Sequence, residues 1–299
     1  MQARPKLLVL GGSGFLGSYL TKSQELAKRF EVIGTFFSSK SKDQVLTYLD
    51  SSDFKELNKL LLELRPELII NCIALTDVDY CQQNPVLSEK INQNFPIVLS
   101  EICSDLKIKL IQISTDHFSS SGLNPRTETT EVQPVNYYGE HKLKAEDGII
   151  SSGCESIILR TNFFGIDGQG KHLLSWIINS FENKLSFTGY TNVYFSPISI
   201  KELITSINLL INNNAKGLFN LSSNESVSKF EFAQLVGEIQ NSNISQVIPG
   251  AFISDPIKSP RPLYMSLSNR RFSTLYNYQF PSIRSMLTQV LHEFPNKTR

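Results

Sequence analysis

Short apolar runs alternate with helical patterns through the first half of this 299-residue chain. Leu7–Leu10 reads as a buried strand, a helical pattern covers Ser18–Arg29, and Val32–Phe37 is the next apolar run. Strands that alternate with helices usually pair in parallel, and the helices then cover both faces of the sheet. The alternation therefore predicts an α/β protein with a Rossmann-like, doubly wound parallel sheet.

The alternation continues to about Thr161 and then fades. Further strands are expected at Leu46–Leu49, Leu68–Ala74, Lys109–Ser114 and Ser156–Leu159, with helices at Phe54–Leu64, Pro85–Leu106 and Tyr137–Ser151. Later helices fit His172–Phe181, Ile200–Asn212 and Lys229–Asn241, and the proline-rich stretch Val247–Leu263 reads as loop. We expect a dinucleotide-binding Rossmann domain over residues 1–163, to which 195–225 returns. A smaller, mixed C-terminal substrate lobe is expected over 164–194 and 226–299.

A glycine-rich turn follows the first expected strand and opens a helix. Gly11, Gly14 and Gly17 have GxxGxxG spacing in the run GGSGFLG. A diphosphate must come close to backbone N–H groups there, and a Cβ atom would be in the way. The helix N-terminus adds positive potential, and the last glycine lets the helix pack closely on the sheet. A tight turn without a ligand is the alternative, but the position after the first strand favours dinucleotide binding by Gly11, Gly14, Phe15, Leu16 and Gly17.

The second strand indicates which dinucleotide. NAD-binding sites often carry an Asp or Glu about 20 residues after the glycines, on the ribose 2′-hydroxyl. No carboxylate occurs here between Glu31 and Asp43, whereas Ser38, Ser39 and Lys40 could hold a 2′-phosphate. NADP(H) is therefore favoured, with NAD(H) as the alternative. These three residues also fit an ordinary solvated loop.

A tyrosine and a lysine lie one helical turn apart. Tyr138 and Lys142 are at i and i+4, so they share a helix face. A nearby ammonium favours the phenolate and makes Tyr138 a usable proton donor or acceptor near neutral pH. Thr115 follows an expected strand at the same sheet edge as the glycine turn, where ligands of such sheets bind. The order of these three residues favours an oxidoreductase in which Thr115 binds the oxygen that Tyr138 protonates.

Composition excludes several classes of partner. The formal net charge is +1, with 29 Lys and Arg against 28 Asp and Glu, so a nucleic-acid or anionic-membrane partner is not expected. No apolar run approaches the roughly 20 residues that span a bilayer, and the start lacks a cleavage pattern. Four cysteines without CxxC spacing fit reduced thiols in a cytoplasmic protein.

Several conspicuous residues have plainer interpretations. Asp77 and Asp79 lack His or Cys partners at ligand spacing, so no metal site is expected. His117 could be a base, but Tyr138 already fills that role, which favours a substrate-pocket or structural role for His117. Trp176 lies in an apolar helical pattern and is expected in the core.

Taken together, these motifs resemble those of the extended short-chain dehydrogenase/reductases and, more narrowly, the dTDP-4-dehydrorhamnose reductase family. The matching segments are Gly11–Gly17, Arg65–Asp79, Ile91–Asn92, Ser114–Asp116, Pro134–Lys142, Leu159–Thr161, Gly217–Leu221, Arg261–Pro262 and Ser266–Leu267. They are spread over the chain, and the stretch Asn71 to Asp79 is much more specific than the glycines.

The resemblance implies an NADPH-dependent reduction of the 4-keto group of a nucleotide-linked 6-deoxyhexose, dTDP-4-dehydro-L-rhamnose to dTDP-L-rhamnose. It implies that Tyr138 protonates the resulting alkoxide, Lys142 tunes Tyr138 and holds the nicotinamide ribose, and Thr115 orients the carbonyl oxygen. The implied further cofactor contacts are Asp50, Ser51, Ile73, Ala74 and Leu75. The implied substrate contacts are Thr76, Val78, Thr115, Asp116, His117, Asn162, Phe163 and Arg261. The expected partner is a nucleotide sugar, and a homodimer is left open.

The sequence departs from the family pattern around the sugar. His117-Phe118-Ser119 stands where the family usually has Tyr-Val-Phe, and Phe163 replaces a family tryptophan. One alternative is a non-catalytic NADP-binding subunit, like the regulatory subunit of methionine adenosyltransferase. Another is an epimerase or a reductase of a different nucleotide sugar. A dehydratase is disfavoured because its usual Asp-Glu is replaced by Asp116-His117.

Overall fold

The computed structural model describes residues 4–37, 46–50, 53–119, 124–167, 170–254 and 258–293. They form two compact units. Unit 1 comprises Met1–Thr115, Pro134–Arg160 and Ile204–Leu218, and unit 2 comprises Asp116–Gln133, Thr161–Leu203 and Phe219–Arg299.

A seven-stranded sheet forms the centre of unit 1. Its order is β11-β6-β5-β4-β1-β2-β3. The strands are β1 (Lys6–Leu10), β2 (Glu31–Phe36), β3 (Leu46–Tyr48), β4 (Leu68–Asn71), β5 (Lys109–Ile113), β6 (Ser156–Thr161) and β11 (Gly217–Leu221). Leu7 is opposite both Val32 and Leu68, and the described pairings run parallel. The prediction of a doubly wound, Rossmann-like parallel sheet is confirmed.

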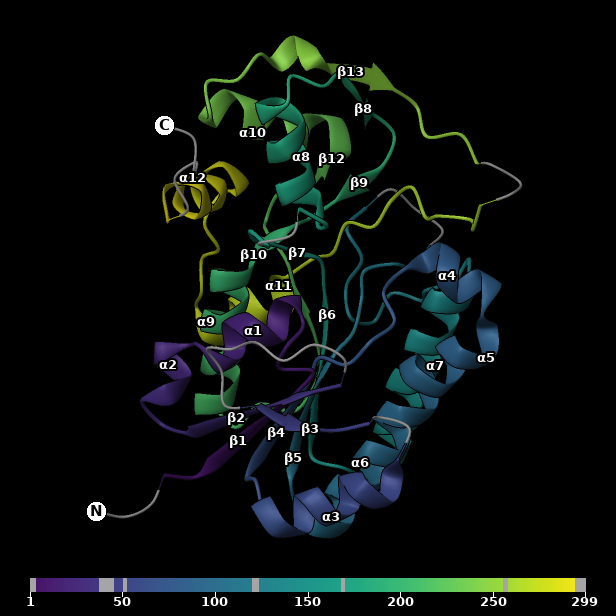
Figure 1. Cartoon of the computed structure of the whole chain (residues 1–299), viewed down its shortest axis with the longest axis vertical. Coiled ribbons are helices and arrows are strands. Elements are labelled where there is room, and N and C mark those ends of the chain that lie inside the picture. Colours follow the sequence, from purple (N-terminus) through teal and green to yellow (C-terminus); the bar gives the residue numbers. More distant parts are fainter. Residues whose placement is uncertain are drawn as a thin grey trace. The chain divides into compact units, whose positions relative to one another are not determined.

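Helices lie against both faces of this sheet (Figure 1). On one face are α1 (Phe15–Thr21), α2 (Gln24–Ala27) and α9 (Ile200–Asn212), and on the other are α3 (Phe54–Leu64), α6 (Phe95–Leu106) and α7 (Tyr137–Ser151). Between α3 and α6 the chain forms α4 (Val78–Gln83), α5 (Pro85–Glu89) and a π-helical turn at Lys90–Asn94. Leu8 and Ile69 of the sheet pack with Leu57, Phe95 and Leu99 in one buried cluster. The apolar runs of the sequence are thus buried on both sides.

Some predicted elements are divided or shortened. The helix expected over Ser18–Arg29 is two helices, because Ser23 is extended and caps α2 by accepting from the Leu26 N–H. The helix expected over Pro85–Leu106 is interrupted by the π-helical turn. The strand expected over Leu68–Ala74 ends at Asn71, whose side chain accepts from the Ile73 N–H and turns the chain out of the sheet.

Unit 2 contains short strand pairs and helices. The strands are β7 (Phe163–Phe164), β8 (Phe187–Tyr190), β9 (Tyr194–Phe195), β10 (Ile198–Ser199), β12 (Val227–Ser228) and β13 (Val247–Gly250), paired as β10-β7, β12-β9 and β13-β8. The helices are α8 (Leu173–Glu182), α10 (Lys229–Ile239), a 3-10 turn (Ile244–Gln246), α11 (Arg270–Tyr276) and α12 (Ile283–Glu293). The stretch that its prolines predict as loop begins with β13, since Pro249 lies in a two-stranded sheet, where one side of each strand needs no partner.

The two units divide the chain differently from the expected domains. Segment 116–133 belongs to unit 2 rather than to the first domain, and the returning segment is 204–218 rather than 195–225. The reason for the first difference is Arg126. Its N–H donates to the Ser266 carbonyl at 2.9 Å, and its side chain donates to the carbonyls of Asp116 and Phe118.

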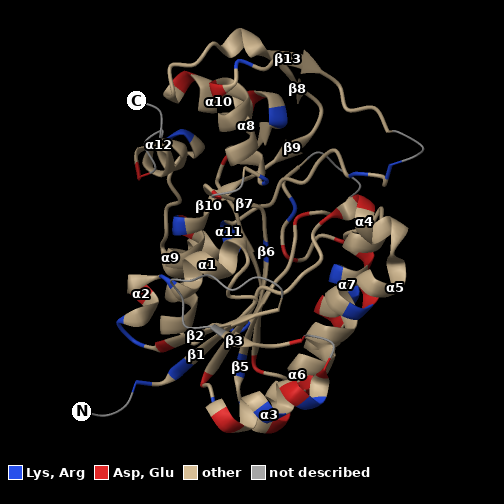
Figure 2. Cartoon of the chain, in the orientation of Figure 1, with Lys and Arg blue, Asp and Glu red and all other residues tan. Residues whose placement is uncertain are grey.

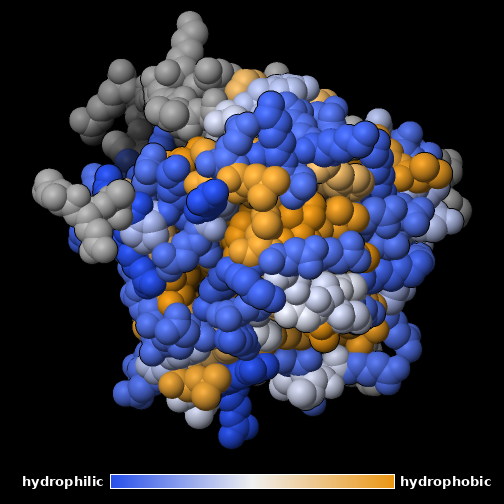
Figure 3. Space-filling view, turned by 90° about the horizontal axis from the view of Figure 1, so that it is seen from below, coloured by the Kyte–Doolittle hydropathy of each residue, from blue (hydrophilic) through white to orange (hydrophobic). Residues whose placement is uncertain are grey.

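Charged and apolar side chains are mixed on the surface. Basic and acidic residues are interspersed along helices such as α3 and α7 (Figure 2). Seen from below, hydrophobic side chains form patches separated by hydrophilic ones (Figure 3). Among the residues that the structure describes, no helix combines the length and the hydrophobicity needed to cross a bilayer.

Candidate active site

The glycine-rich turn is held closely against the neighbouring strands. Gly11 has a φ of +76°, and its N–H donates to the Thr35 hydroxyl at 3.0 Å. A Cβ at Gly11 would lie 3.2 Å from the Ile73 nitrogen. A Cβ at Gly17 would overlap the Gly11 carbonyl oxygen and come within 2.9 Å of the Gly12 Cα. The turn therefore needs glycine at 11 for its conformation and at 17 for the close packing of α1.

A pocket of about 240 Å³ opens beside this turn. It is lined by Gly11, Ser13, Gly14, Thr35, Phe36, Phe37, Leu49, Cys72, Ile73, Ala74, Leu75 and Ile91. The structure thus brings together five residues that were predicted to contact a cofactor: Gly11, Gly14, Ile73, Ala74 and Leu75. Leu16 and Gly17 are buried behind the turn, and Phe15 begins α1.

The predicted 2′-phosphate site falls largely outside the described residues. Ser38, Ser39, Lys40 and Ser51 are not among them. Asp50 is described and is partly buried, directly after Leu49 of the pocket. The choice between NADP(H) and NAD(H) by these residues stays a prediction.

Helix α7 presents the tyrosine and the lysine. Asn136 caps the helix by accepting from the Gly139 N–H at 2.9 Å, so Tyr138 lies in the first turn. Tyr138 is half-buried, and Lys142 follows one turn later on the same face. The Lys142 ammonium donates to the Ile113 carbonyl at 2.6 Å. Because Ile113 ends β5, this bond ties α7 to the strand end that leads to Thr115.

Burial changes the protonation of Lys142. Its side chain is enclosed, with 3% of the residue exposed. Desolvation lowers the pKa of Lys142 to about 8, although the electrostatic interactions of Lys142 with Glu146 and Cys72 raise it. Thr115 is also buried and comes two residues after the end of β5. Unit 1 therefore combines a buried ammonium, a half-buried phenol and a buried hydroxyl with the glycine turn.

A buried ion pair lies one turn beyond Lys142. Glu146 accepts two hydrogen bonds from Arg160, from Nε at 3.0 Å and from Nη2 at 2.6 Å. The Ser114 hydroxyl donates to the same carboxylate. All three residues are buried. Sequence reasoning missed this set, although the spacing 138, 142, 146 would have placed Glu146 on the face of Tyr138 and Lys142.

Unit 2 holds a separate polar cluster around Asp116. The Asn162 amide donates to the Asp116 carboxylate at 2.9 Å. Burial raises the pKa of Asp116 to about 6, although the charges of Lys229 and Arg126 and the Asn162 hydrogen bond lower it. Asp116 and Asn162 were predicted as substrate contacts, and the structure places them together.

Two cations in this cluster, Lys229 and Arg126, were not predicted from the sequence. Lys229, the first residue of α10, is half-buried, with its ammonium 3.3 Å from the centre of the Phe195 ring. Desolvation lowers the pKa of Lys229 to about 8. No motif marks Lys229 or Arg126, because each is defined by long-range packing.

His117 lies among the same charges. Burial, followed by the charges of Arg261, Lys229 and Arg126, lowers the pKa of His117 to about 4. The imidazole is therefore neutral at physiological pH. His117 and Arg261, both predicted substrate contacts, act on each other electrostatically in unit 2.

The other predicted substrate contacts are spread between the units. Phe163 belongs to β7 of unit 2 and is half-buried. In unit 1, Thr76 is exposed, whereas Val78 is buried at the start of α4. Within the described residues, no group of three or more His, Cys, Asp or Glu side chains could hold a metal ion.

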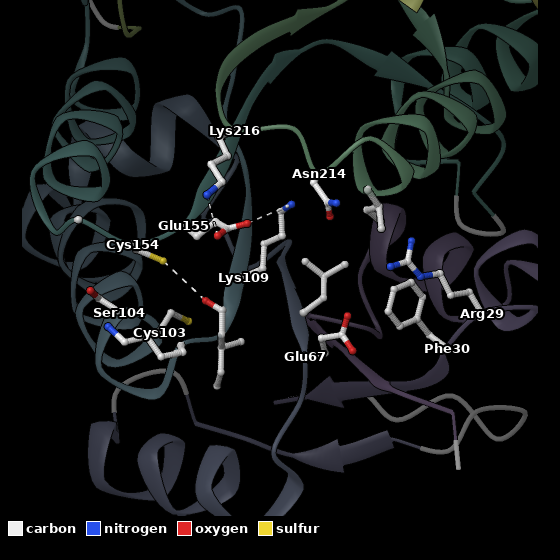
Figure 4. Close-up of a pocket in the computed structure, with 15 residues that line it drawn as sticks. Arg29, Phe30, Glu67, Cys103, Ser104, Lys109, Cys154, Glu155, Asn214 and Lys216 are labelled. Atoms are coloured by element: carbon white, nitrogen blue, oxygen red, sulfur yellow. Dashed lines mark hydrogen bonds and ion pairs between the residues drawn. The ribbon is translucent and has the colours of Figure 1, made fainter. Parts of the chain in front are cut away.

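A second cavity of unit 1, of about 540 Å³, lies at the opposite edge of the sheet (Figure 4). Its lining includes Leu68 and Lys109, which begin β4 and β5, and Lys216, which precedes β11. Glu155 binds Lys216 at 2.8 Å and Lys109 at 3.4 Å. Ligands of open α/β sheets bind at the carboxyl ends of the strands, so the candidate site is the pocket beside Gly11.

The sequence matches the family described as RmlD substrate binding domain over residues 5–296. Three curated relatives are similar along most of their length. A probable low-salt glycan biosynthesis reductase, Agl14, of Haloferax volcanii is 27% identical and aligns over 87% of this chain and 89% of its own. The dTDP-4-dehydrorhamnose reductase of Mycobacterium tuberculosis is 25% identical over 98% and 94%. The methionine adenosyltransferase 2 subunit beta of Mus musculus is 24% identical over 97% and 88%.

The fold is also that of solved structures. A crystal structure of dTDP-4-dehydrorhamnose reductase from Bacillus anthracis in complex with NADP superposes with a TM-score of 0.87. It covers 97% of this chain and 99% of its own, at 23% identity. The similarity extends through both units.

Proposed function

Because the chain belongs to the RmlD substrate binding domain family, within the extended short-chain dehydrogenase/reductases, we propose that it reduces a nucleotide-linked sugar with NADPH. The proposed reaction is reduction of the 4-keto group of a 6-deoxyhexose, with dTDP-4-dehydro-L-rhamnose as the substrate and dTDP-L-rhamnose as the product.

The observation that carries the proposal is the arrangement of unit 1. Tyr138 and Lys142 lie on one face of α7, and the Lys142 ammonium is bound to the strand end that leads to Thr115. The carboxyl ends of β1 and β4 carry the glycine turn and Ile73–Leu75, which line one pocket.

The pocket beside the glycine turn fits a dinucleotide. Gly14 lines it, and a Cβ there would make a tight contact of 3.2 Å with the Gly11 carbonyl oxygen but would not overlap it, so packing alone does not exclude a side chain at this position. Its lack of a side chain instead leaves room for a diphosphate. Thr35, Phe36 and Leu49 provide the wall for an adenosine. NADPH supplies the hydride for the reduction when it is bound.

In the proposed reaction, side chains of unit 1 donate a proton to the sugar oxygen, stabilise the phenolate that remains and hold the sugar oxygen in place. Tyr138 donates its phenolic proton to the sugar oxygen as negative charge develops there. The Lys142 ammonium stabilises the phenolate that remains. Thr115 donates a hydrogen bond to the same sugar oxygen and fixes its position before proton transfer.

For the nucleotide we propose a pocket of unit 2. This pocket of about 240 Å³ is lined by Trp176, Phe187, Tyr190 and Lys229 among others. Trp176 and Phe187 meet edge to face with their ring centres 4.9 Å apart. An aromatic wall suits stacking of a base, and an ammonium suits a phosphate. The sugar contacts predicted for Asp116, His117, Asn162, Phe163 and Arg261 remain predictions beside it.

The test is NADPH oxidation with dTDP-4-dehydro-L-rhamnose by the wild type and by Tyr138→Phe. The wild type should turn over, and the variant should lose about 10²-fold or more in kcat because it lacks the proton donor. NADPH affinity should change little. Equal turnover by both proteins would show that Tyr138 is not the acid.

The similarity to methionine adenosyltransferase 2 subunit beta favours one second candidate, a non-catalytic NADP-binding subunit. Tight NADPH binding without turnover of nucleotide sugars by the wild type would support this candidate. The same result would overturn the reductase proposal.

A further inference from the structure

A buried carboxylate lies one turn beyond Lys142 on α7. Glu146 follows Lys142 by four residues on α7, so their side chains are neighbours on the helix surface. Glu146 is 2% exposed, and its carboxylate accepts from the side chains of Arg160 and Ser114. The three elements α7, β6 and β5 therefore meet at one buried carboxylate.

This carboxylate fixes the strand end that precedes Thr115. Ser114 donates its backbone N–H to the Leu159 carbonyl at 2.7 Å and its hydroxyl to Glu146. The neighbouring Ile113 carbonyl accepts from the Lys142 ammonium. Helix α7 therefore binds two consecutive residues, the Ile113 carbonyl through Lys142 and the Ser114 hydroxyl through Glu146. These two bonds set the position of Thr115 relative to Lys142.

Glu146 also supplies the negative charge near the buried ammonium. Of the two groups that raise the pKa of Lys142, Cys72 is half-buried, and desolvation raises the pKa of its thiol to about 12, so this thiol is neutral near pH 7. Arg160 is the charge that faces Glu146 from β6. On the side of α4 and α5, His141 binds Ser88, and the pKa of His141 is lowered by burial. Glu146 is therefore the anion that offsets the desolvation of Lys142.

We propose that Glu146 is a positioning residue, which keeps Lys142 charged and in place and aligns the end of β5 through Ser114 and Arg160. This inference rests on the proposed function, in which Lys142 assists Tyr138. It adds a buried support that acts through Lys142 and touches neither substrate nor cofactor.

The experiment compares Glu146→Gln with Glu140→Gln. Glutamine keeps the shape of Glu146 and can still bind Ser114, but it removes the charge. Glu140 lies on the same helix, and it pairs with Lys144 in an exposed ion pair at 2.7 Å, so Glu140→Gln is the matched control. The readout is the protonation midpoint of Lys142, followed by the ¹³C shift of its Cε in lysine-labelled protein and assigned with Lys142→Arg.

The wild-type midpoint should lie near pH 8, since burial lowers the pKa of Lys142 to about 8. Glu146→Gln should move it to lower pH by about 1 unit or more, because an opposite charge within a few ångströms shifts a pKa by about that amount. Glu140→Gln should leave it in place. An unmoved midpoint in folded Glu146→Gln overturns the inference.

A second readout is the pH dependence of activity and of NADPH affinity. Lys142 is charged below its pKa, so both should fall as the pH rises through about 8 in the wild type and at lower pH in Glu146→Gln. Glu146→Asp keeps the charge and should restore the wild-type profile. A purely structural role would lower activity at every pH without moving the profile, and that result would also overturn the inference.

Removal of Glu146 leaves Arg160 buried without its carboxylate, which could prevent folding. The double variant Glu146→Gln/Arg160→Met removes both charges and covers that case. Its Lys142 midpoint should also lie below that of the wild type, and an unchanged midpoint would contradict the proposal. The midpoint requires no substrate, so a failure of the reductase proposal is distinguishable from a failure of this one.

Discussion

Lys142 and Asp116 show what burial does to single charged side chains in the two units. Desolvation lowers the pKa of Lys142 to about 8 and raises that of Asp116 to about 6, although each faces opposite charge. Both shifts move the group toward neutrality. Groups whose desolvated side chains have pKa values that approach physiological pH are typical of functional sites, so both units contain residues whose charge depends on their immediate surroundings.

The glycines of the first turn have separable roles. Gly14→Ala should cost less thermal stability than Gly17→Ala, because the φ of Gly14 is −75° and its Cβ would meet the Gly11 carbonyl oxygen at 3.2 Å, a tight contact without overlap. It should weaken NADPH binding, since the new methyl group occupies the diphosphate position. Gly17→Ala should instead cost about 1–3 kcal/mol of stability, because its Cβ overlaps the Gly11 carbonyl.

Thermal denaturation and NADPH titration of both variants distinguish the two roles. Full NADPH affinity in Gly14→Ala would show that the diphosphate lies elsewhere. An undisturbed melting temperature in Gly17→Ala would contradict the packing argument.

Helix α7 illustrates why some elements could be predicted from the sequence. The predicted ranges Phe54–Leu64 and Tyr137–Ser151 agree with α3 and α7, because both helices begin at a residue whose side chain caps the backbone. Asp53 accepts from the N–H groups of Lys55 and Glu56, and Asn136 accepts from that of Gly139. Such signals are local. The division of 85–106 by a π-helical turn has no local signal of this kind.

The cap of α7 should affect activity more than an equivalent cap elsewhere. Asn136→Ala should cost about 1 kcal/mol by removing the bond to the Gly139 N–H. Because Tyr138 lies in that first turn, fraying should also lower kcat. Asp53→Ala is the control, since it should cost a similar amount at the start of α3 and leave kcat unchanged.

Chemical denaturation and initial rates measure the two effects. Equal loss of kcat in both cap variants would mean that the effect arises from general destabilisation rather than from the position of Tyr138.

Part of the candidate site could be predicted because its residues, like the helix caps, give local signals in the sequence. Gly11–Gly17, Thr115, Tyr138 and Lys142 form sequence motifs, and the structure brings the glycines together with Ile73–Leu75. Lys229 and Arg126 lie in no motif, and they reach Asp116 only through the packing of unit 2. Trp176 was expected in the core, but it is 43% exposed and lines the unit 2 pocket. Hydrophobic periodicity identifies an apolar face without indicating whether protein or ligand covers it.

Across the whole chain, the four thiols should differ in reactivity. Burial raises the pKa of Cys72 to about 12 and also raises that of Cys81. The pKa of Cys103 is raised first by its hydrogen bond with Cys154 and then by burial. The same hydrogen bond lowers the pKa of Cys154, which is half-buried beside the cavity of Figure 4. Because the thiolate is the reactive form, a brief iodoacetamide pulse near pH 7.5 should label Cys154 first.

Peptide mass spectrometry of the native protein follows the labelling, with Cys154→Ser as the control. That variant should show little early alkylation at its remaining cysteines. Faster labelling of Cys72 than of Cys154 would contradict the order.

Neither unit is one continuous length of chain, since each is assembled from three segments. The chain passes from one unit to the other after Thr115, Gln133, Arg160, Leu203 and Leu218, and three of these passages lie within β6, α9 and β11. No single truncation can therefore isolate either unit as an independent module. An exchange of substrate specificity with a relative would have to graft three separate segments at once, and the grafts would join within two strands and one helix that must stay intact.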